Sequence, residues 1–84
     1  MAKSQMRDAV ASHVARILRE EREKRRLSMT VLAERAGLSQ AMISFVEREI
    51  RNPSLDTMLR IAEVFEMNLG EIINRAYKAA SKSK

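Results

Sequence analysis

Three segments of this sequence repeat one pattern that marks where helices begin. In each, an apolar residue comes just before a Ser or an Asn, and a second apolar residue follows that polar residue by four positions. The segments are Leu27-Ser28-Leu32, Leu38-Ser39-Ile43 and Met67-Asn68-Ile72. Ser and Asn side chains cap helix N-termini, and apolar residues on the two sides of a cap pack together as a hydrophobic staple. The pattern therefore predicts three helix starts in one register.

The rest of the sequence extends this prediction to five helices and no sheet. The chain has 84 residues with only two Gly and one Pro, and residues that favour helices are plentiful. We expect helices over about residues 8–26, 29–36, 40–49, 54–65 and 68–80. Gly37 supplies the left-handed residue that ends the second of them. The predicted fold class is all-α, as one compact domain.

The two ends of the chain are expected to extend beyond this domain. We expect residues 1–7 to form a flexible N-terminal arm, residues 8–78 the folded domain, and residues 79–84 a basic C-terminal tail. Chain ends with little apolar content tend to fray. The charges of the tail either contact a polyanion or simply stay solvated.

Composition excludes several classes of protein. Sixteen basic residues against eleven acidic ones give a net charge of +5. This charge suits nucleic acid or an anionic membrane surface, although a domain can carry it without such a partner. The absence of Cys excludes disulfides, thiol catalysis and zinc fingers. The start lacks a secretory h-region, and no apolar run approaches the roughly 18 residues of a membrane span. We therefore expect a cytoplasmic protein with no membrane partner.

The residue pattern does not favour catalysis. The single His, His13, lies at the edge of the apolar stripe of the first helix without a partner motif. No metal-ligand spacing and no Gly-rich phosphate loop occurs in the sequence. We expect no enzyme activity, no cofactor, no metal and no small-molecule ligand.

Residues 28–49 have the spacing of two short helices joined by a tight turn. Ala33 is small where the two helices must approach closely, and Gly37 lies at the turn four positions later. The inward positions are Leu32, Ala36, Leu38, Ile43 and Val46. This is the helix-turn-helix pattern. The alternative is an ordinary helical hairpin inside a bundle.

From about Val14 to Ile73 the chain resembles the Cro and phage-repressor class of helix-turn-helix domains. This class includes xenobiotic-response-element-type regulators and restriction–modification controller proteins. The residues that carry the resemblance are "LSMTVLAERAGLSQAMISFVE" and the following "RNPSLDTMLRIAEVF". The resemblance implies a compact five-helix, lambda-repressor-like domain. It also implies a sequence-specific transcriptional regulator that binds double-stranded DNA.

The resemblance assigns roles to individual residues. The helix that begins at Gln40 would be the recognition helix, with its N-terminal part in the major groove. The base-reading residues would be Gln40, Ala41, Ser44 and Phe45. The phosphate-binding residues would be Ser28, Met29, Thr30, Ser39, Arg48, Arg51 and Asn52. Phosphate contacts position such a protein, and base contacts specify the sequence.

Phe45 is an aromatic residue on the outward face of the recognition helix. On a helical wheel at about 100° per residue, Ile43, Val46 and Ile50 share one face. Phe45 lies roughly 130° from that face. The resemblance makes Phe45 a DNA contact that packs on a thymine methyl group, which only the major groove displays. The alternative is that Phe45 folds over Met42 or a neighbouring loop and covers the core.

The resemblance also implies an ion pair between Arg22 and Glu47 that fixes the recognition helix against the first helix. The alternative role of Arg22 is a simple phosphate contact.

The sequence departs from the family pattern at three positions. Met29 stands where the family usually has a Gln that contacts a phosphate and braces the recognition helix. Arg26 and Glu49 stand where the family usually has Gly. A non-Gly residue tolerates positive φ poorly, so we expect the third helix to continue to Ile50 and to turn differently.

A domain of this class covers one half-site, so we expect a homodimer on a palindromic operator. The fifth helix carries a wide apolar stripe, and we expect a symmetric interface there. The interface residues would be Ile72, Ile73, Ala76 and Tyr77. The alternative is that Leu69, Ile72 and Ile73 close the monomer core. The alternative function is a protein-interaction module of the same fold, antitoxin- or coactivator-like, in which Phe45 and Tyr77 contact protein.

Overall fold

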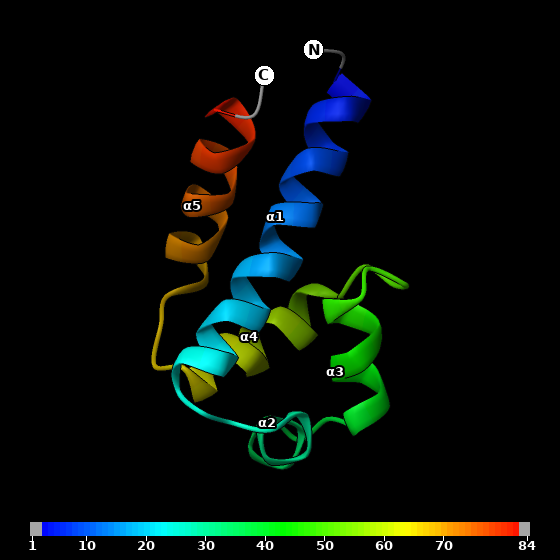
Figure 1. Ribbon diagram of the computed structural model, residues 1–84, viewed down its shortest axis with the longest axis vertical. Coiled ribbons are helices and arrows are strands. Elements are labelled where there is room, and N and C mark those ends of the chain that lie inside the picture. The colour runs from blue at the N-terminus through cyan, green and yellow to red at the C-terminus, as the bar shows by residue number, and fades with distance from the viewer. Residues whose placement is uncertain (1–2, 83–84) are drawn as a thin grey trace.

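The computed structural model describes residues 3–82, and all of its regular structure is helical. The helices are α1 (Lys3–Lys24), α2 (Met29–Ala36), α3 (Gln40–Glu47), α4 (Leu55–Val64) and α5 (Leu69–Lys82). Helices α1 and α5 lie side by side and run in opposite directions, while α2, α3 and α4 gather around the C-terminal end of α1 (Figure 1). The predicted all-α, five-helix fold is confirmed.

One hydrophobic core joins the five helices. Its buried members are Val10, Val14, Ile17, Leu18, Leu32, Ala33, Ile43, Val46, Ile61, Ala62, Phe65, Ile72, Ala76 and Ala80. Of the inward positions predicted for α2 and α3, Leu38 is half-buried and packs against this core, and the other four are buried. Ala33 is 3% exposed, which fits its predicted place where α2 and α3 approach closely. The core therefore fixes the angle between α2 and α3.

Three of the connections between helices share the same backbone conformation and hydrogen bonding. Each contains a residue in the left-handed region, namely Arg26 (φ 57°), Gly37 (φ 70°) and Glu66 (φ 55°). The next residue is apolar, and its N–H donates to a carbonyl five positions earlier, at 3.1 Å for Leu27, 2.9 Å for Leu38 and 3.0 Å for Met67. This is the Schellman motif. The third residue is the Ser or Asn that caps the following helix, so the three predicted helix starts are present.

The first helix is longer than predicted. It begins at Lys3, so the prediction of a flexible arm is wrong for residues 3–7, while residues 1 and 2 lie outside the described residues. Met6 packs against the core, four positions before Val10. Residues at this spacing lie on one helix face, so the apolar stripe starts one turn earlier than expected.

The last helix is also longer than predicted. Helix α5 continues to Lys82, and Ala80 is wholly buried in the core. The prediction of a fraying tail is therefore wrong for residues 79–82, while residues 83 and 84 lie outside the described residues. A single small buried side chain near the helix end holds this turn against the rest of the domain.

Helix α3 ends earlier than predicted, at Glu47. Glu49 adopts a positive φ of 60°, and the N–H of Ile50 donates to the carbonyl of Phe45 at 2.9 Å. The expectation that the helix continues to Ile50 is wrong. The turn carries Ile50 off the apolar face of α3 and leaves it 52% exposed.

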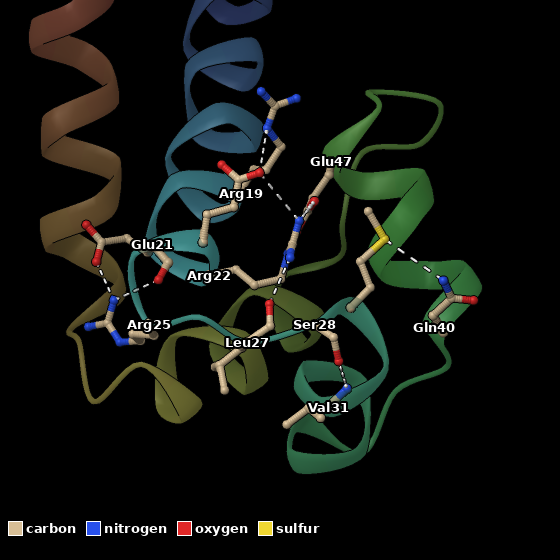
Figure 2. Close-up of polar contacts among 11 residues, drawn as sticks. Arg19, Glu21, Arg22, Arg25, Leu27, Ser28, Val31, Gln40 and Glu47 are labelled. Atoms are coloured by element: carbon tan, nitrogen blue, oxygen red, sulfur yellow. Dashed lines mark hydrogen bonds and ion pairs between the residues drawn. The ribbon is translucent and has the colours of Figure 1, made fainter.

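A buried carboxylate ties the C-terminal part of α1 to two other helices. Glu21 is 5% exposed and accepts a hydrogen bond of 2.8 Å from Arg75 of α5. It also accepts one from Arg25 (Figure 2). Arg25 also donates to the carbonyl of Phe65 at 2.9 Å and lies over its ring. The hydrogen bonds from Arg75 and then Arg25 hold the pKa of Glu21 below its usual value.

Candidate nucleic-acid interface

The outward face of α3 carries the residues expected to read bases. Ile43 and Val46 point into the core. Of the four predicted base-reading residues, Gln40 and Ala41 are exposed, and Ser44 and Phe45 are half-buried. These four side chains therefore lie on the part of α3 that the domain leaves accessible.

The N-terminus of α3 is capped by Ser39. Its backbone is extended, and its side-chain oxygen accepts the N–H of Met42 at 3.1 Å. The first amides of a helix have no acceptor within that helix. The exposed start of α3 can therefore donate hydrogen bonds outward, which suits its predicted role beside a phosphate.

The N-terminus of α2 is capped by a Ser side chain in the same way. The side chain of Ser28 accepts the N–H of Val31 at 3.0 Å (Figure 2). Met29 and Thr30 occupy the first two positions of the helix, and Ser28 and Thr30 are exposed. Backbone amides and the positive end of the helix dipole make such a start an anion-binding position.

Met29 links these two helix starts. The side-chain amide nitrogen of Gln40 lies 4.0 Å from the sulfur of Met29, a contact drawn in Figure 2. A thioether is a weak hydrogen-bond acceptor. With Met29 in place of the usual Gln, the start of α2 still contacts the recognition helix, now through the sulfur of Met29.

Arg22 and Glu47 make the ion pair that the resemblance implied (Figure 2). Arg22 Nε donates to one carboxylate oxygen at 2.6 Å, and Nη2 donates to the other at 2.9 Å. Arg22 Nη1 also donates to the carbonyl of Leu27 at 2.8 Å. The two side chains are 11% and 3% exposed, and the hydrogen bonds to Glu47 raise the pKa of Arg22. This pair fixes α3 against α1 and against the connection that leads into α2.

Phe45 is covered in part by the loop that follows α3. The guanidinium of Arg51 lies over its ring, with 5.5 Å between Cζ and the ring centroid. The structure thus brings together a predicted base-reading residue and a predicted phosphate-binding residue. The contact also agrees in part with the alternative expectation that Phe45 packs against a neighbouring loop, because Arg51 lies in the loop after α3.

The other two basic or amide side chains predicted after α3 are exposed. Arg48 caps the C-terminus of α3, and its N–H donates to the carbonyl of Ser44 at 3.0 Å. Asn52 lies in the connection to α4 and borders shallow hollows against α1. Both side chains are accessible to a backbone phosphate, and so is that of Arg51.

A contact between α1 and the turn after α3 was missed by sequence reasoning. The hydroxyl of Ser12 donates to the carboxylate of Glu49, the left-handed residue of that turn. The two residues are 37 positions apart, and neither belongs to a periodic pattern. Only the packing of α1 against α3 brings them together, so the sequence offered no signal for it.

Two of the four predicted interface residues are unavailable to a second copy. Ile72 and Ala76 are wholly buried in the monomer core, so their prediction as dimer contacts is wrong. Ile73 is half-buried and packs against the core, and Tyr77 is 51% exposed. Most of the apolar stripe of α5 is therefore used to close the monomer core.

Among residues 3–82, no group of three or more His, Cys, Asp or Glu side chains is placed to hold a metal ion. In the same part of the chain, no helix combines the length and the apolar character needed to cross a bilayer.

The fold and this face together define a helix-turn-helix protein. Residues 18–72 match the profile of the Helix-turn-helix family, of the Cro/C1 type, and the chain belongs to this family. It is 39% identical over 59 residues to proteins named as uncharacterized HTH-type transcriptional regulators in two strains of Mycobacterium tuberculosis. The match covers 70% of this chain and 42% of each relative, so the chain spans less than half the length of these relatives. No solved structure matches the chain significantly.

Proposed function

We propose that this chain is a sequence-specific regulator of transcription that binds double-stranded DNA by inserting the N-terminal part of α3 into the major groove. The observation that carries the proposal is the contact between Met29 and Gln40. It supports the proposal because it holds the start of α2, where backbone amides can bind an anion, beside the start of α3, which carries the proposed base-reading residues. Phosphate and base contacts are then made from one rigid surface, as major-groove recognition by a helix-turn-helix requires.

The residues of this surface suit the chemistry of B-DNA. Gln40 carries the amide that can bind the N6 and N7 positions of adenine together. Arg48, Arg51 and Asn52 follow α3 and are exposed, so they can hold the backbone next to the groove that α3 enters. The net charge of +5 adds long-range attraction to a polyanion.

The proposed regulator acts as a homodimer on a palindromic operator. Among the side chains that the structure describes, four large apolar ones are exposed, and three of them lie in the segment just after α3, namely Ile50, Leu55 and Leu59. Leu55 and Leu59 are one turn apart and share a face of α4, beside the ion pair of Asp56 and Arg60. A face with apolar residues and both signs of charge can pair with a copy of itself about a two-fold axis. We therefore place the dimer contact on α4, with Tyr77 of α5 as the alternative.

The second candidate function is a protein-interaction module of the same fold. The observation that favours it is the exposure of Leu55, Leu59 and Tyr77 at 62%, 49% and 51%. These side chains would then contact a different protein instead of a second copy of this chain.

Selection from a randomised duplex pool at two salt concentrations tests the proposal. We expect enrichment of a palindrome whose half-sites lie about one helical turn, roughly 34–36 Å, apart. Affinity for it is expected to fall with salt at a log–log slope near −0.9 per neutralised phosphate. As a matched pair, Gln40→Ala is expected to relax the selected sequence, while Glu71→Gln at an exposed position of α5 leaves it unchanged. Failure to retain any duplex at low salt would overturn the proposal in favour of the protein-interaction module.

A further inference from the structure

We propose that Arg51 positions the ring of Phe45, so that base reading and phosphate binding on this surface act as one unit. The inference rests on the DNA-binding function proposed above. It starts from the guanidinium of Arg51, whose Cζ lies 5.5 Å from the centroid of the Phe45 ring. A cation at this distance over an aromatic face is attracted by the negative charge of the ring face.

The backbone brings these two side chains together. The carbonyl of Phe45 accepts the N–H of Ile50 at 2.9 Å and the N–H of Arg51 at 3.3 Å. The chain reverses at Glu49, whose φ is 60°, and the hydroxyl of Ser12 binds the carboxylate of that residue. The position of Arg51 over Phe45 is therefore set by the turn, and α1 supports the turn.

The stack limits what the Phe45 ring can do. An aromatic side chain on a helix surface has more than one staggered rotamer available. Arg51 favours the rotamer in which the ring lies under its guanidinium, and it covers one face of the ring. The remaining ring surface is then held in one place for an apolar contact such as a thymine methyl group.

The same stack leaves Arg51 able to bind a phosphate. A guanidinium stacks through its flat face and donates hydrogen bonds from its edges. Arg51 is exposed, so its edge donors are accessible while its face lies on the ring. A Lys in its place keeps the positive charge but has no planar group to stack.

Replacing single thymines by deoxyuridine tests the inference, because the change removes only the methyl group. On the selected operator, wild-type protein is expected to lose about three- to fourfold in affinity at one thymine of each half-site, the effect of one buried methyl group. Phe45→Ala is expected to abolish this loss. Arg51→Lys is expected to keep the salt dependence of binding and to abolish most of the loss. The matched control Arg48→Lys changes an exposed Arg that does not lie over the ring, and is expected to retain the loss in full.

Each outcome bears on one of the two proposals. A full deoxyuridine effect in Arg51→Lys would overturn the positioning role of Arg51. The absence of any sensitive thymine in the wild type, with operator binding intact, would overturn the role of Phe45 and leave the DNA-binding function standing. Failure of the wild-type protein to bind any duplex at low salt would overturn the proposed DNA-binding function. Thermal melting of Arg51→Lys and Arg48→Lys, expected to match the wild type because both side chains are exposed, separates these results from misfolding.

Discussion

Arg22 of α1 and Glu47 of α3 face each other through two hydrogen bonds of 2.6 and 2.9 Å, across 25 positions of sequence. Both side chains are almost fully removed from solvent. Removing Arg22 leaves the buried Glu47 carboxylate without its ion-pair partner, and removing Glu47 leaves Arg22 with only the carbonyl of Leu27 and the exposed Glu23 at 4.0 Å. Glu47→Ala and Arg22→Ala are therefore each expected to destabilise the domain by about 3–5 kcal/mol. Urea unfolding at neutral pH measures this loss.

The double substitution Arg22→Met with Glu47→Leu provides the control for that prediction. Replacing both charges by apolar side chains removes the uncompensated ion, so the double variant is expected to be more stable than either single variant. Additive losses in the double variant would contradict the assignment of the destabilisation to a stranded charge.

Glu21 makes the stability of the domain depend on pH. Its pKa is lowered from 4.5 in the folded chain by Arg75 and Arg25, so the folded state favours the ionised carboxylate. The stabilisation is therefore fully present above about pH 4.5 and is lost as the pH falls through the lowered folded value. We expect the stability difference between wild type and Glu21→Gln to shrink between pH 6 and pH 3, as measured by urea unfolding at several pH values.

Glu20→Gln is the matched control for the pH experiment. Glu20 lies next to Glu21 on α1, but its side chain is 55% exposed and lies 4.0 Å from Arg16. Exposed pairs of this kind contribute little, so the variant is expected to stay within about 0.5 kcal/mol of the wild type. An equal pH dependence in the two variants would show that the Glu21 cluster is not its source.

Two of the left-handed positions that end helices are suboptimal. Arg26 and Glu66 have φ of 57° and 55°, where a side chain costs about 1 kcal/mol and Gly does not. Arg26→Gly and Glu66→Gly are each expected to stabilise the domain by about 0.5–1 kcal/mol. This corresponds to a rise in melting temperature of roughly 4–8 °C per kcal/mol for a domain of this size.

Gly37 supplies the opposite test. Its φ is +70°, and an added Cβ would lie 3.0 Å from Nη1 of Arg60. Gly37→Ala is expected to lower the melting temperature, with a loss of about 1–2 kcal/mol. If Gly37→Ala and Arg26→Gly shift the melting temperature in the same direction, the backbone explanation is wrong for both.

Dimerisation through α4 is tested by introducing charge on its exposed face. Leu59→Arg is expected to convert the dimer to a monomer in sedimentation equilibrium and to weaken operator binding, since two half-sites then bind independently. Leu59 is 49% exposed, so the fold is expected to survive the substitution. Tyr77→Arg, at a side chain of similar exposure on α5, is expected to remain dimeric. The reverse pattern would place the interface on α5.

Local signals predicted most of the fold from the sequence. Ser28, Ser39 and Asn68 each cap a helix, because capping depends on residues within one turn of the chain. Residue periodicity likewise predicted the core of α2 and α3. Positions that depend on tertiary support were missed: Glu49 takes a conformation that its residue type disfavours, and α1 holds its carboxylate.

The candidate site was predicted in part for the same reason. The outward face of α3 follows from helical spacing, and the exposure of Gln40 agrees with it. The stack of Arg51 on Phe45 depends on the turn after α3, whose geometry was predicted wrongly. The apolar stripe of α5 was likewise misinterpreted, because periodicity shows which face is apolar but not whether the monomer core or a second copy covers it, and Ile72 and Ala76 are buried in the monomer core.

The short connections that contain Arg26 and Gly37 leave α2 and α3 little freedom to change their positions in the domain. Each contains one left-handed residue, one packed apolar residue and one cap, so neither has spare chain to act as a hinge. In the proposed complex the protein is then the stiff partner, and any misfit is absorbed by bending or twisting of the duplex. The affinity for different operators would then depend partly on flexible pyrimidine–purine steps between the half-sites, at base pairs that no side chain touches.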